Sequence, residues 1–353
     1  MLVHKDVVRE PLYVVTPIFN PVRFQARWMH YRDFAKRMVD AGAKLVTIEA
    51  AFGERDHAIQ EHAPDGDGHR YIRLRVGQDS ELWLKENLQN IAATYLPPGW
   101  KYMAPIDADM AFAHPDIVDA TLHALQHFDV VQMYSHIVSA GPNHEPLSLQ
   151  PSFAYQHVNG LRQAGVPSGE YSGAAMLASK KPASGKNVWG TPGGAWAWRR
   201  SAFDAVGRFI DHAILGAADH YMALALIGDL ESGLDPRFTA GYREPILNWQ
   251  ACAEATIKRN IGYIDGTIWH YWHGAQANRR YNTRAQILVR NQFDPARDLK
   301  RDWQGVIALT GTKPRLRDDV RAYFRQRNED CVHVPDQESR LVGPKPAADW
   351  STP

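Results

Sequence analysis

The first half of the chain alternates short apolar runs with segments of helical periodicity. Apolar runs at 13–18 and 45–49 predict two strands, and apolar residues recur at steps of three and four between residues 25 and 41, as on one face of a helix. Gly42 ends the predicted helix, because glycine readily takes the positive φ found just past a helix C-terminus. A strand, a helix and a strand in this order predict a parallel pair with a right-handed crossover.

The same alternation continues to about residue 135. It predicts an open α/β sheet, in which ligands bind at the carboxyl ends of the strands. The further strands are expected at 71–76, 101–106 and 130–134, and the further helices at 82–95 and 117–127.

The second half is less regular. Residues 140–195 are rich in glycine, proline and serine, and we expect a loop there, mobile over Lys180–Trp196; long loops inside compact domains are usually functional or disordered. Helices are predicted at 201–206, 219–230 and 315–328. No linker precedes about residue 330, so we expect a catalytic domain over residues 1–290 and a basic C-terminal extension over 291–353, with a helix and a loose tail.

Composition narrows the class of protein. The chain has 353 residues, 44% of them hydrophobic, and a net charge of +1, so no overall field demands a polyanionic partner. Cys252 and Cys331 are too few for a disulfide framework. The first ten residues lack the apolar segment of a signal peptide, and no apolar run is long enough to span a membrane. We therefore expect a soluble, cytoplasmic protein.

Two acidic residues follow the predicted strand at 101–106. Asp107 and Asp109 are spaced i, i+2, so one carboxylate can bind a cation directly and the other through water or a ribose. Mn²⁺ or Mg²⁺ held in this way bridges to the phosphates of a nucleotide-sugar and stabilises the leaving nucleotide. The alternative is a pair of acids that only cap a turn.

A second group of candidate ligands comes late in the chain. His270 and His273 flank Tyr271 and Trp272, and neutral imidazole suits Mn²⁺ better than Mg²⁺. Either histidine could complete the cation's ligands, and both are candidates. If 268–272 is a strand, its alternation separates Tyr271 from His270. The alternative is a histidine pair packed among aromatic residues.

The order of these motifs resembles that of the GT-A glycosyltransferases, of the inverting galactosyl- and N-acetylgalactosaminyltransferase-like groups (family 2/7-like, bacterial or phage type). The pieces that carry the resemblance are TPIFN, PIDADM, GGAWAWRRSAFDAVGRF, GAADHYM and IWHYWHG, within residues 11–290. It implies a GT-A (Rossmann-like) mixed sheet flanked by helices, with a C-terminal helical extension. It also implies transfer of a hexose from a UDP-sugar to a hydroxyl, with inversion.

The resemblance implies particular roles for residues. Asp219 would be the general base, and we expect burial to raise its pKa; the alternative is an N-cap for a helix that begins at His220. Glu49 would bind the base or ribose, or else be a surface carboxylate. Trp189 would close over the donor. The other expected donor contacts are Thr16, Pro17, Phe19, Arg73, Gly193 and Gly194, with Arg73 otherwise a solvated residue.

The acceptor is suggested only by charge. Residues 255–330 hold 15 Lys and Arg against 8 Asp and Glu, which favours an anionic acceptor unless the stretch is simply a solvated face. One candidate is a hydroxymethylated base in phage DNA, flipped out of the duplex; another is a surface glycan. Two other functions stay open: a non-catalytic carbohydrate-binding protein, and a nucleotidyltransferase of the same fold. The latter needs a glycine-rich loop after the first strand, and TPIFNPVRF has no glycine.

Overall fold

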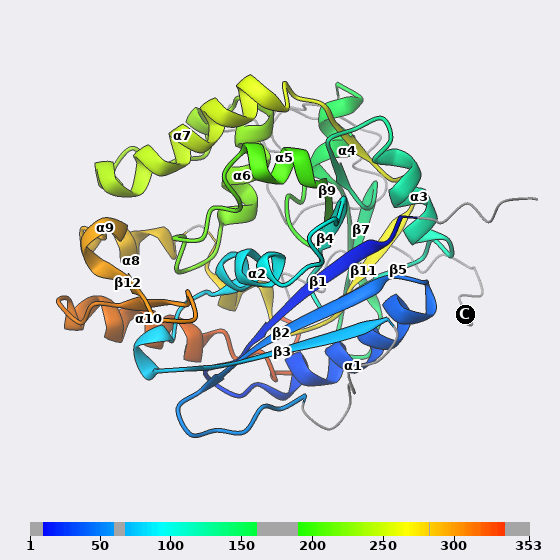
Figure 1. Ribbon diagram of the computed structural model, residues 1–353. Helices are drawn as coiled ribbons and strands as arrows, with labels where there is room; N and C mark the ends of the chain where they lie inside the picture. The colour runs from blue at the N-terminus through cyan, green and yellow to red at the C-terminus, as the bar shows by residue number, and fades with distance from the viewer. Residues whose placement is uncertain (1–9, 60–67, 161–189, 282, 336–353) are drawn as a thin grey trace, which may run out of the picture.

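A computed structural model describes residues 10–59, 68–160, 190–281 and 283–335. Its centre is a seven-stranded sheet in the order β10-β6-β9-β4-β1-β2-β3 (Figure 1). β9 runs antiparallel to β4 and β6, and the other neighbours are parallel. The predicted mixed sheet flanked by helices is confirmed. The strands are β1 (Leu12–Phe19), β2 (Lys44–Phe52), β3 (His69–Val76), β4 (Tyr102–Pro105), β6 (Val130–Gln132), β9 (Trp196–Arg199) and β10 (Ile261–Tyr263).

Helices cover both faces of this sheet, which explains why β1 and β2 are apolar along almost their whole length. Val14 belongs to the core beneath α1 and α3, whereas Val15 belongs to the core beneath α2 and α5–α7. Alternate residues of one strand therefore anchor two separate layers. These helices are α1 (Gln25–Asp40), α2 (Lys85–Thr94), α3 (Ile117–Ala124), α5 (Arg200–Ala205), α6 (Ala218–Ile227) and α7 (Ala240–Thr256).

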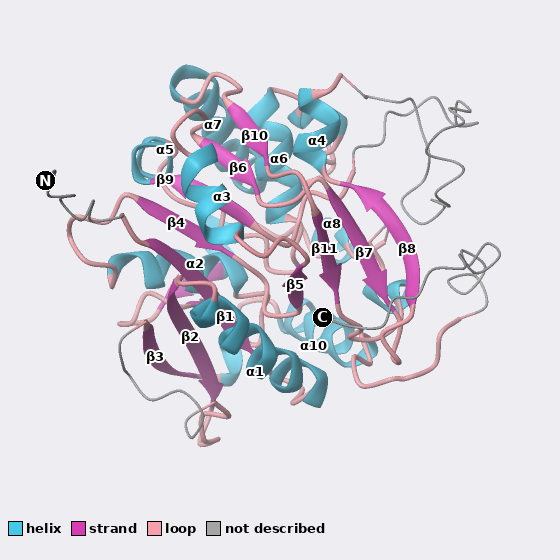
Figure 2. Ribbon diagram, turned by 90° about the vertical axis from the view of Figure 1, so that its right-hand side faces the viewer, coloured by secondary structure: helices cyan, strands magenta, loops and turns pink. Residues whose placement is uncertain are grey.

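A second sheet corrects the prediction of an unbroken loop over 140–195. Its order is β5-β11-β7-β8, and β7 and β8 form an antiparallel hairpin (Figure 2). Pro146 and Pro151 bound β8, and prolines are tolerated there because β8 lies at the edge of the sheet. Residues 161–189 lie outside the described residues. The elements here are β5 (Met110–Phe112), β7 (His136–Ala140), β8 (Pro146–Pro151), β11 (Thr267–His270) and α4 (Phe153–Val158).

The described residues beyond 290 pack against the larger sheet's helices. Val306, Leu316 and Tyr323 belong to the same core cluster as Leu88 of α2. None of the described helices is long and apolar enough to cross a membrane. The elements are α8 (Ala285–Arg290), α9 (Pro295–Asp298), β12 (Leu299–Arg301), β13 (Ile307–Leu309) and α10 (Pro314–Gln326), with short 3-10 helices η1 (Gln78–Ser80), η2 (Leu230–Ser232) and η3 (Gln276–Arg279).

Candidate active site

A cleft of about 1530 Å³ opens at the carboxyl ends of β1 and β4. Its walls come from the β4–β5 turn, the segment that follows β11, the start of α6, and the stretch from η3 to α8. Asp107, Asp109, Asp219, His270 and His273 all line it. The structure thus brings every predicted catalytic and metal-binding residue into one cavity, at the sheet edge that the strand order predicts.

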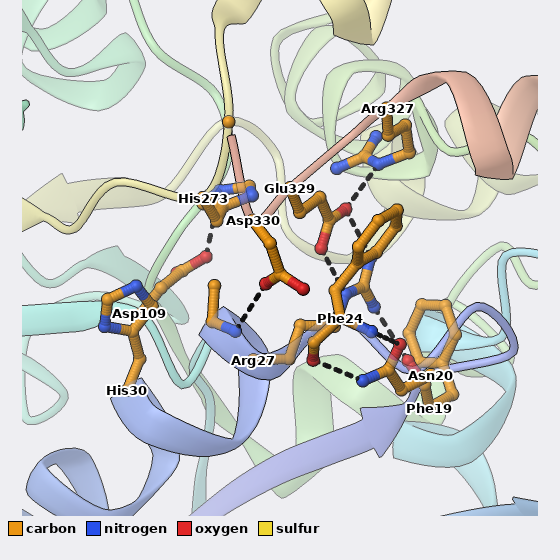
Figure 3. A network of polar contacts seen from close by, with 12 residues as sticks. Phe19, Asn20, Phe24, Arg27, His30, Asp109, His273, Arg327, Glu329 and Asp330 are labelled. Atoms are coloured by element: carbon orange, nitrogen blue, oxygen red, sulfur yellow. Dashed lines mark hydrogen bonds and ion pairs between the residues drawn. The ribbon is translucent and has the colours of Figure 1, made fainter. Parts of the chain in front are cut away.

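Asp109 and both histidines lie together in this cleft. The Asp109 Oδ2 atom is 3.1 Å from His273 Nε2 and 3.6 Å from His270 Nε2, and the two imidazole nitrogens are 3.0 Å apart. Both histidines thus lie within reach of the same carboxylate, and the three side chains could hold one metal ion. Figure 3 shows Asp109 and His273 pointing toward one another.

Local pairing explains why the three side chains meet. β11 runs antiparallel to β5, and the Tyr271 N–H donates to the Asp109 carbonyl at 2.9 Å. His270 ends β11, whereas His273 follows it and turns back because Gly274 adopts a φ of +83°. Even a Cβ at Gly274 would lie 2.8 Å from the Asn328 carbonyl, so the turn is tightly enclosed and needs glycine.

The chemistry of this trio fits a divalent cation. Asp109 Oδ1 is buried and, among the described residues, has no hydrogen-bond partner. Burial alone would raise the pKa of Asp109, but His270 and then His273 hold it well below its usual value. Burial, followed by the charge of Arg279, keeps the pKa of His273 well below its usual value. An ionised carboxylate and a neutral imidazole are the forms that bind Mn²⁺.

Asp107 has a different partner, which the sequence did not predict. Its Oδ2 atom accepts a hydrogen bond from Lys85 Nζ at 2.9 Å, and the same Nζ lies 3.7 Å from Asp219 Oδ2. The ammonium therefore sits between the two carboxylates. Lys85 begins α2, and no sequence motif marks it. Asp107 is not part of the group formed by Asp109 and the histidines.

Asp219 lies in the first turn of α6, where a negative charge is favoured by the helix dipole. The helix begins at Ala218 and Ala217 is its N-cap, so the alternative of an Asp219 N-cap for a helix from His220 is wrong. The expected raised pKa is also wrong. Burial does oppose ionisation, but Lys85 and then Arg284 outweigh it and lower the pKa of Asp219.

Two glycines complete this part of the cleft. The Gly194 carbonyl accepts a hydrogen bond from the Asp107 N–H at 2.9 Å. Gly194 itself has a φ of +97°. A Cβ at Gly193 would lie 2.6 Å from Asp219 Oδ2. The Gly193 carbonyl accepts from the Tyr134 hydroxyl at 2.6 Å. The pair therefore fixes the Asp107 backbone and leaves room for the Asp219 carboxylate.

Only some of the residues predicted to contact the donor lie in the wall of the cleft. Pro17 and Phe19 line the cleft, whereas Thr16 is fully buried in β1 and is not part of the wall. Glu49 is 4% exposed, so the alternative of a surface carboxylate is wrong. Its carboxylate accepts hydrogen bonds from the Ala58 and Ile59 N–H groups and from the Tyr71 hydroxyl. It is not part of the cleft wall. Arg73 stacks on the Tyr71 ring at 4.4 Å, also outside it. Trp189 lies outside the described residues.

A network of polar contacts joins the cleft to the C-terminal segment (Figure 3). The Glu329 carboxylate accepts from Arg27 Nε and Nη2 at 2.6 and 2.8 Å and from Arg327 Nε at 2.6 Å. Asp330 accepts from the N–H groups of Gln25 and Ala26, at the start of α1. Both arginines line the cleft, and sequence reasoning missed all of these contacts.

No family model matches the sequence, and no curated protein matches it significantly. Solved structures that match include S. aureus TarS in complex with UDP (12% identity, 79% of this chain and 65% of that one, TM-score 0.36). Another is the catalytic domain of Drosophila β1,4-galactosyltransferase 7 with xylobiose (12% identity, 64% of this chain and 63% of that one, TM-score 0.31). A third is M. tuberculosis glucosyl-3-phosphoglycerate synthase (13% identity, 73% of this chain and 71% of that one, TM-score 0.33). These are nucleotide-sugar transferases, as the GT-A resemblance implied.

Proposed function

We propose that this protein is a metal-dependent glycosyltransferase that moves a hexose from a UDP-sugar to a hydroxyl acceptor. One observation carries the proposal. A single cleft holds Asp109, His270 and His273, a trio that could hold a cation, and, apart from it, the Asp219 carboxylate. Glycosyl transfer needs both functions side by side: stabilisation of a leaving diphosphate and removal of a proton from the acceptor.

Asp109, His270 and His273 would hold the cation, and Asp107 would reach it through water or contact the ribose. A bound Mn²⁺ or Mg²⁺ supplies positive charge for the diphosphate as the sugar leaves. Pro17 and Phe19 offer an apolar wall for the base. Thr16, Glu49 and Arg73 lie outside the described wall of the cleft, and Trp189 lies outside the described residues, so their donor contacts stay predictions.

Asp219 would act as the general base. Its lowered pKa keeps the carboxylate ionised at neutral pH, so it is ready to accept the proton of an acceptor hydroxyl. Lys85, within 3.7 Å, compensates the charge and fixes the orientation. A positioned base contributes roughly 10²–10⁴-fold to the rate. An acceptor activated on the side of the sugar opposite the nucleotide would react with inversion.

The donor can be identified by thermal shift. A panel of nucleotide-sugars is tested with and without Mn²⁺; at 100 Kd a ligand adds about 2.7 kcal/mol of stability. We expect one UDP-hexose to stabilise the protein only when Mn²⁺ is present, and Asp109→Ala to remove that effect. Equal shifts with and without the cation, or none with any nucleotide-sugar, would contradict the proposal.

Catalysis is tested separately with Asp219→Asn. This variant keeps the shape of the side chain but cannot accept a proton, so donor and Mn²⁺ binding should persist while turnover falls about 10²–10⁴-fold. Slow hydrolysis of the donor by the wild-type protein gives a readout that needs no acceptor. A non-catalytic carbohydrate-binding protein would hydrolyse no donor, and a nucleotidyltransferase would instead release pyrophosphate from a nucleoside triphosphate.

A further inference from the structure

The wall of the cleft contains three arginines from one short stretch of the chain. Arg279, Arg280 and Arg284 lie between the last turn of η3 and the start of α8, and all three line the cleft. No ion pair within 4.0 Å joins any of them to an acidic group of the described chain. Arg284 acts on the Asp219 carboxylate through space and lowers its pKa, but within the described residues none of the three arginines has a carboxylate in direct contact.

This is not the rule for the basic stretch in which they lie. Arg290 pairs with Asp319, Arg301 with Asp211, and Arg327 with Glu329. Much of the charge asymmetry of residues 255–330 is thus neutralised inside the protein. Arg279, Arg280 and Arg284 have no such partner among the described residues and line the cleft, where a bound ligand can supply a negative charge.

Arg279 gives the sharpest indication. It is 8% exposed, and its Nε atom is buried without any hydrogen-bond partner among the described residues. Among the described residues its other nitrogens make long contacts, at 3.3 Å to the Tyr281 hydroxyl and 3.5 Å to the Gly274 carbonyl. Because a buried charged group with an unsatisfied donor and no carboxylate in contact is strongly disfavoured, its retention here points to an anionic ligand.

The arginines also lie between the two halves of the site, which are the trio of Asp109, His270 and His273 and the Asp219 carboxylate. Arg279 reaches the carbonyl of Gly274, the residue that follows His273. Arg284 Nη1 lies 3.2 Å from the position of a Cβ on Gly216, just before the α6 turn that carries Asp219. Arg284 also stacks on the Tyr281 ring at 4.9 Å. A ligand held by these groups would lie between the metal-binding trio and Asp219.

We propose that Arg279, Arg280 and Arg284, with the Tyr281 hydroxyl, form a binding site for a phosphate group. Guanidinium forks match phosphate oxygens and form paired, charge-assisted hydrogen bonds. The phosphate belongs either to the diphosphate of the donor or to a phosphorylated acceptor. Only the choice between these two sources rests on the proposed function; the binding of phosphate by the cluster does not.

The experiment compares Arg279→Gln and Arg284→Gln with Arg290→Gln, an arginine of the same stretch that is paired with Asp319. UDP and uridine are titrated calorimetrically into each protein with Mg²⁺ present, and inorganic phosphate is titrated into each protein both alone and saturated with UDP. If the donor diphosphate uses the site, the two cleft variants lose at least about tenfold in UDP affinity, while uridine binding and Arg290→Gln are unaffected. If a phosphorylated acceptor uses it, UDP binding is kept and phosphate binding to the UDP-saturated protein is lost.

Unchanged binding of both UDP and phosphate in both cleft variants would overturn the proposal, as would equal losses in Arg290→Gln. Arg279 is nearly buried, so circular dichroism must establish that its variant folds. If it does not, Arg280→Gln, at an exposed position, makes the same test. Failure of the proposed function is distinguishable: such a protein binds no nucleotide, yet phosphate binding to the free protein still depends on the arginines.

Discussion

Glu329→Gln tests how firmly the C-terminal segment is bound to the rest of the protein. The Glu329 side chain is 1% exposed, and its carboxylate receives three hydrogen bonds of 2.6–2.8 Å from Arg27 and Arg327. Glutamine has the same shape, but it removes the negative charge shared by two guanidiniums. Its amide NH₂ would also face groups that can only donate.

The expected loss is large because the pair is buried. Each arginine attracts the carboxylate by about 4 kcal/mol at 4 Å and an effective dielectric constant near 20, and removing one member of a buried pair costs about 3–5 kcal/mol. We therefore expect Glu329→Gln to lower the free energy of unfolding by about 3–5 kcal/mol near pH 7. The matched control is Asp204→Asn, which breaks an exposed pair with Arg200 and should cost about 0–1 kcal/mol.

The loss should depend on pH with a definite sign. Burial alone would raise the pKa of Glu329, but Arg27 and then Arg327 hold it well below its usual value. An acid with a depressed pKa stabilises the fold fully above its unfolded pKa of about 4.3, and this contribution is lost as the pH falls toward the folded pKa. The difference between wild type and Glu329→Gln should thus be constant at neutral pH and shrink below about pH 4.

Urea denaturation followed by circular dichroism, repeated from about pH 7 to pH 3, measures both effects. Arg27→Met and the double variant with Glu329→Gln complete a double-mutant cycle, which isolates the coupling between the two side chains. A loss of less than about 1 kcal/mol at neutral pH would mean that this buried pair stabilises the fold no more than an exposed ion pair does. That result would refute the reasoning. A loss that stays the same at every pH would show that lost packing, and not charge, is responsible.

The other predictions concern the cleft. His273→Ala should weaken Mn²⁺ binding about 10–100-fold by calorimetry, whereas His123→Ala, at an exposed position of α3, should leave it unchanged; equal effects would refute the metal assignment. Lys85→Met removes a charge that lowers the pKa of Asp219, so the acidic limb of the pH–turnover profile should move to higher pH, and an unmoved limb would contradict this. Gly193→Ala places a Cβ 2.6 Å from Asp219 Oδ2; we expect kcat to fall with little change in Tm, and an unchanged kcat would mean that the carboxylate need not hold this position.

Periodicity and strand order were sufficient to predict much of the larger sheet and the position of the site. Apolar runs buried on both faces mark β1 and β2 as central parallel strands, and acids just past β4 must then lie at the ligand-binding edge. The hairpin of β7 and β8 was missed because its proline and serine content is typical of loops. Such residues are tolerated in an edge strand. The sequence of the segment does not show that it will pair at the edge of a sheet, because that depends on the rest of the fold.

The parts of the site that could not be predicted depend on contacts between distant segments. Lys85 is one lysine at the start of α2, and only the folded chain places it between Asp107 and Asp219. The same is true of its effect on Asp219. Burial is predictable from sequence in part, whereas the opposing charge of Lys85 is not, so the direction of the pKa shift of Asp219 was predicted wrongly.

The contact of residues 327–331 with α1 has a consequence for the order in which the protein assembles. Asp330 supplies the hydrogen-bond acceptors for the first N–H groups of α1, and the Cys331 carbonyl accepts from the Trp272 indole. Arg27 and Glu329 are 302 positions apart. During synthesis α1 therefore emerges long before its cap, and the loop bearing His273 emerges before the segment that encloses it. Because Arg27 and Arg327 both line the cleft, the cleft takes its final form only after residues 327–331 have been synthesised.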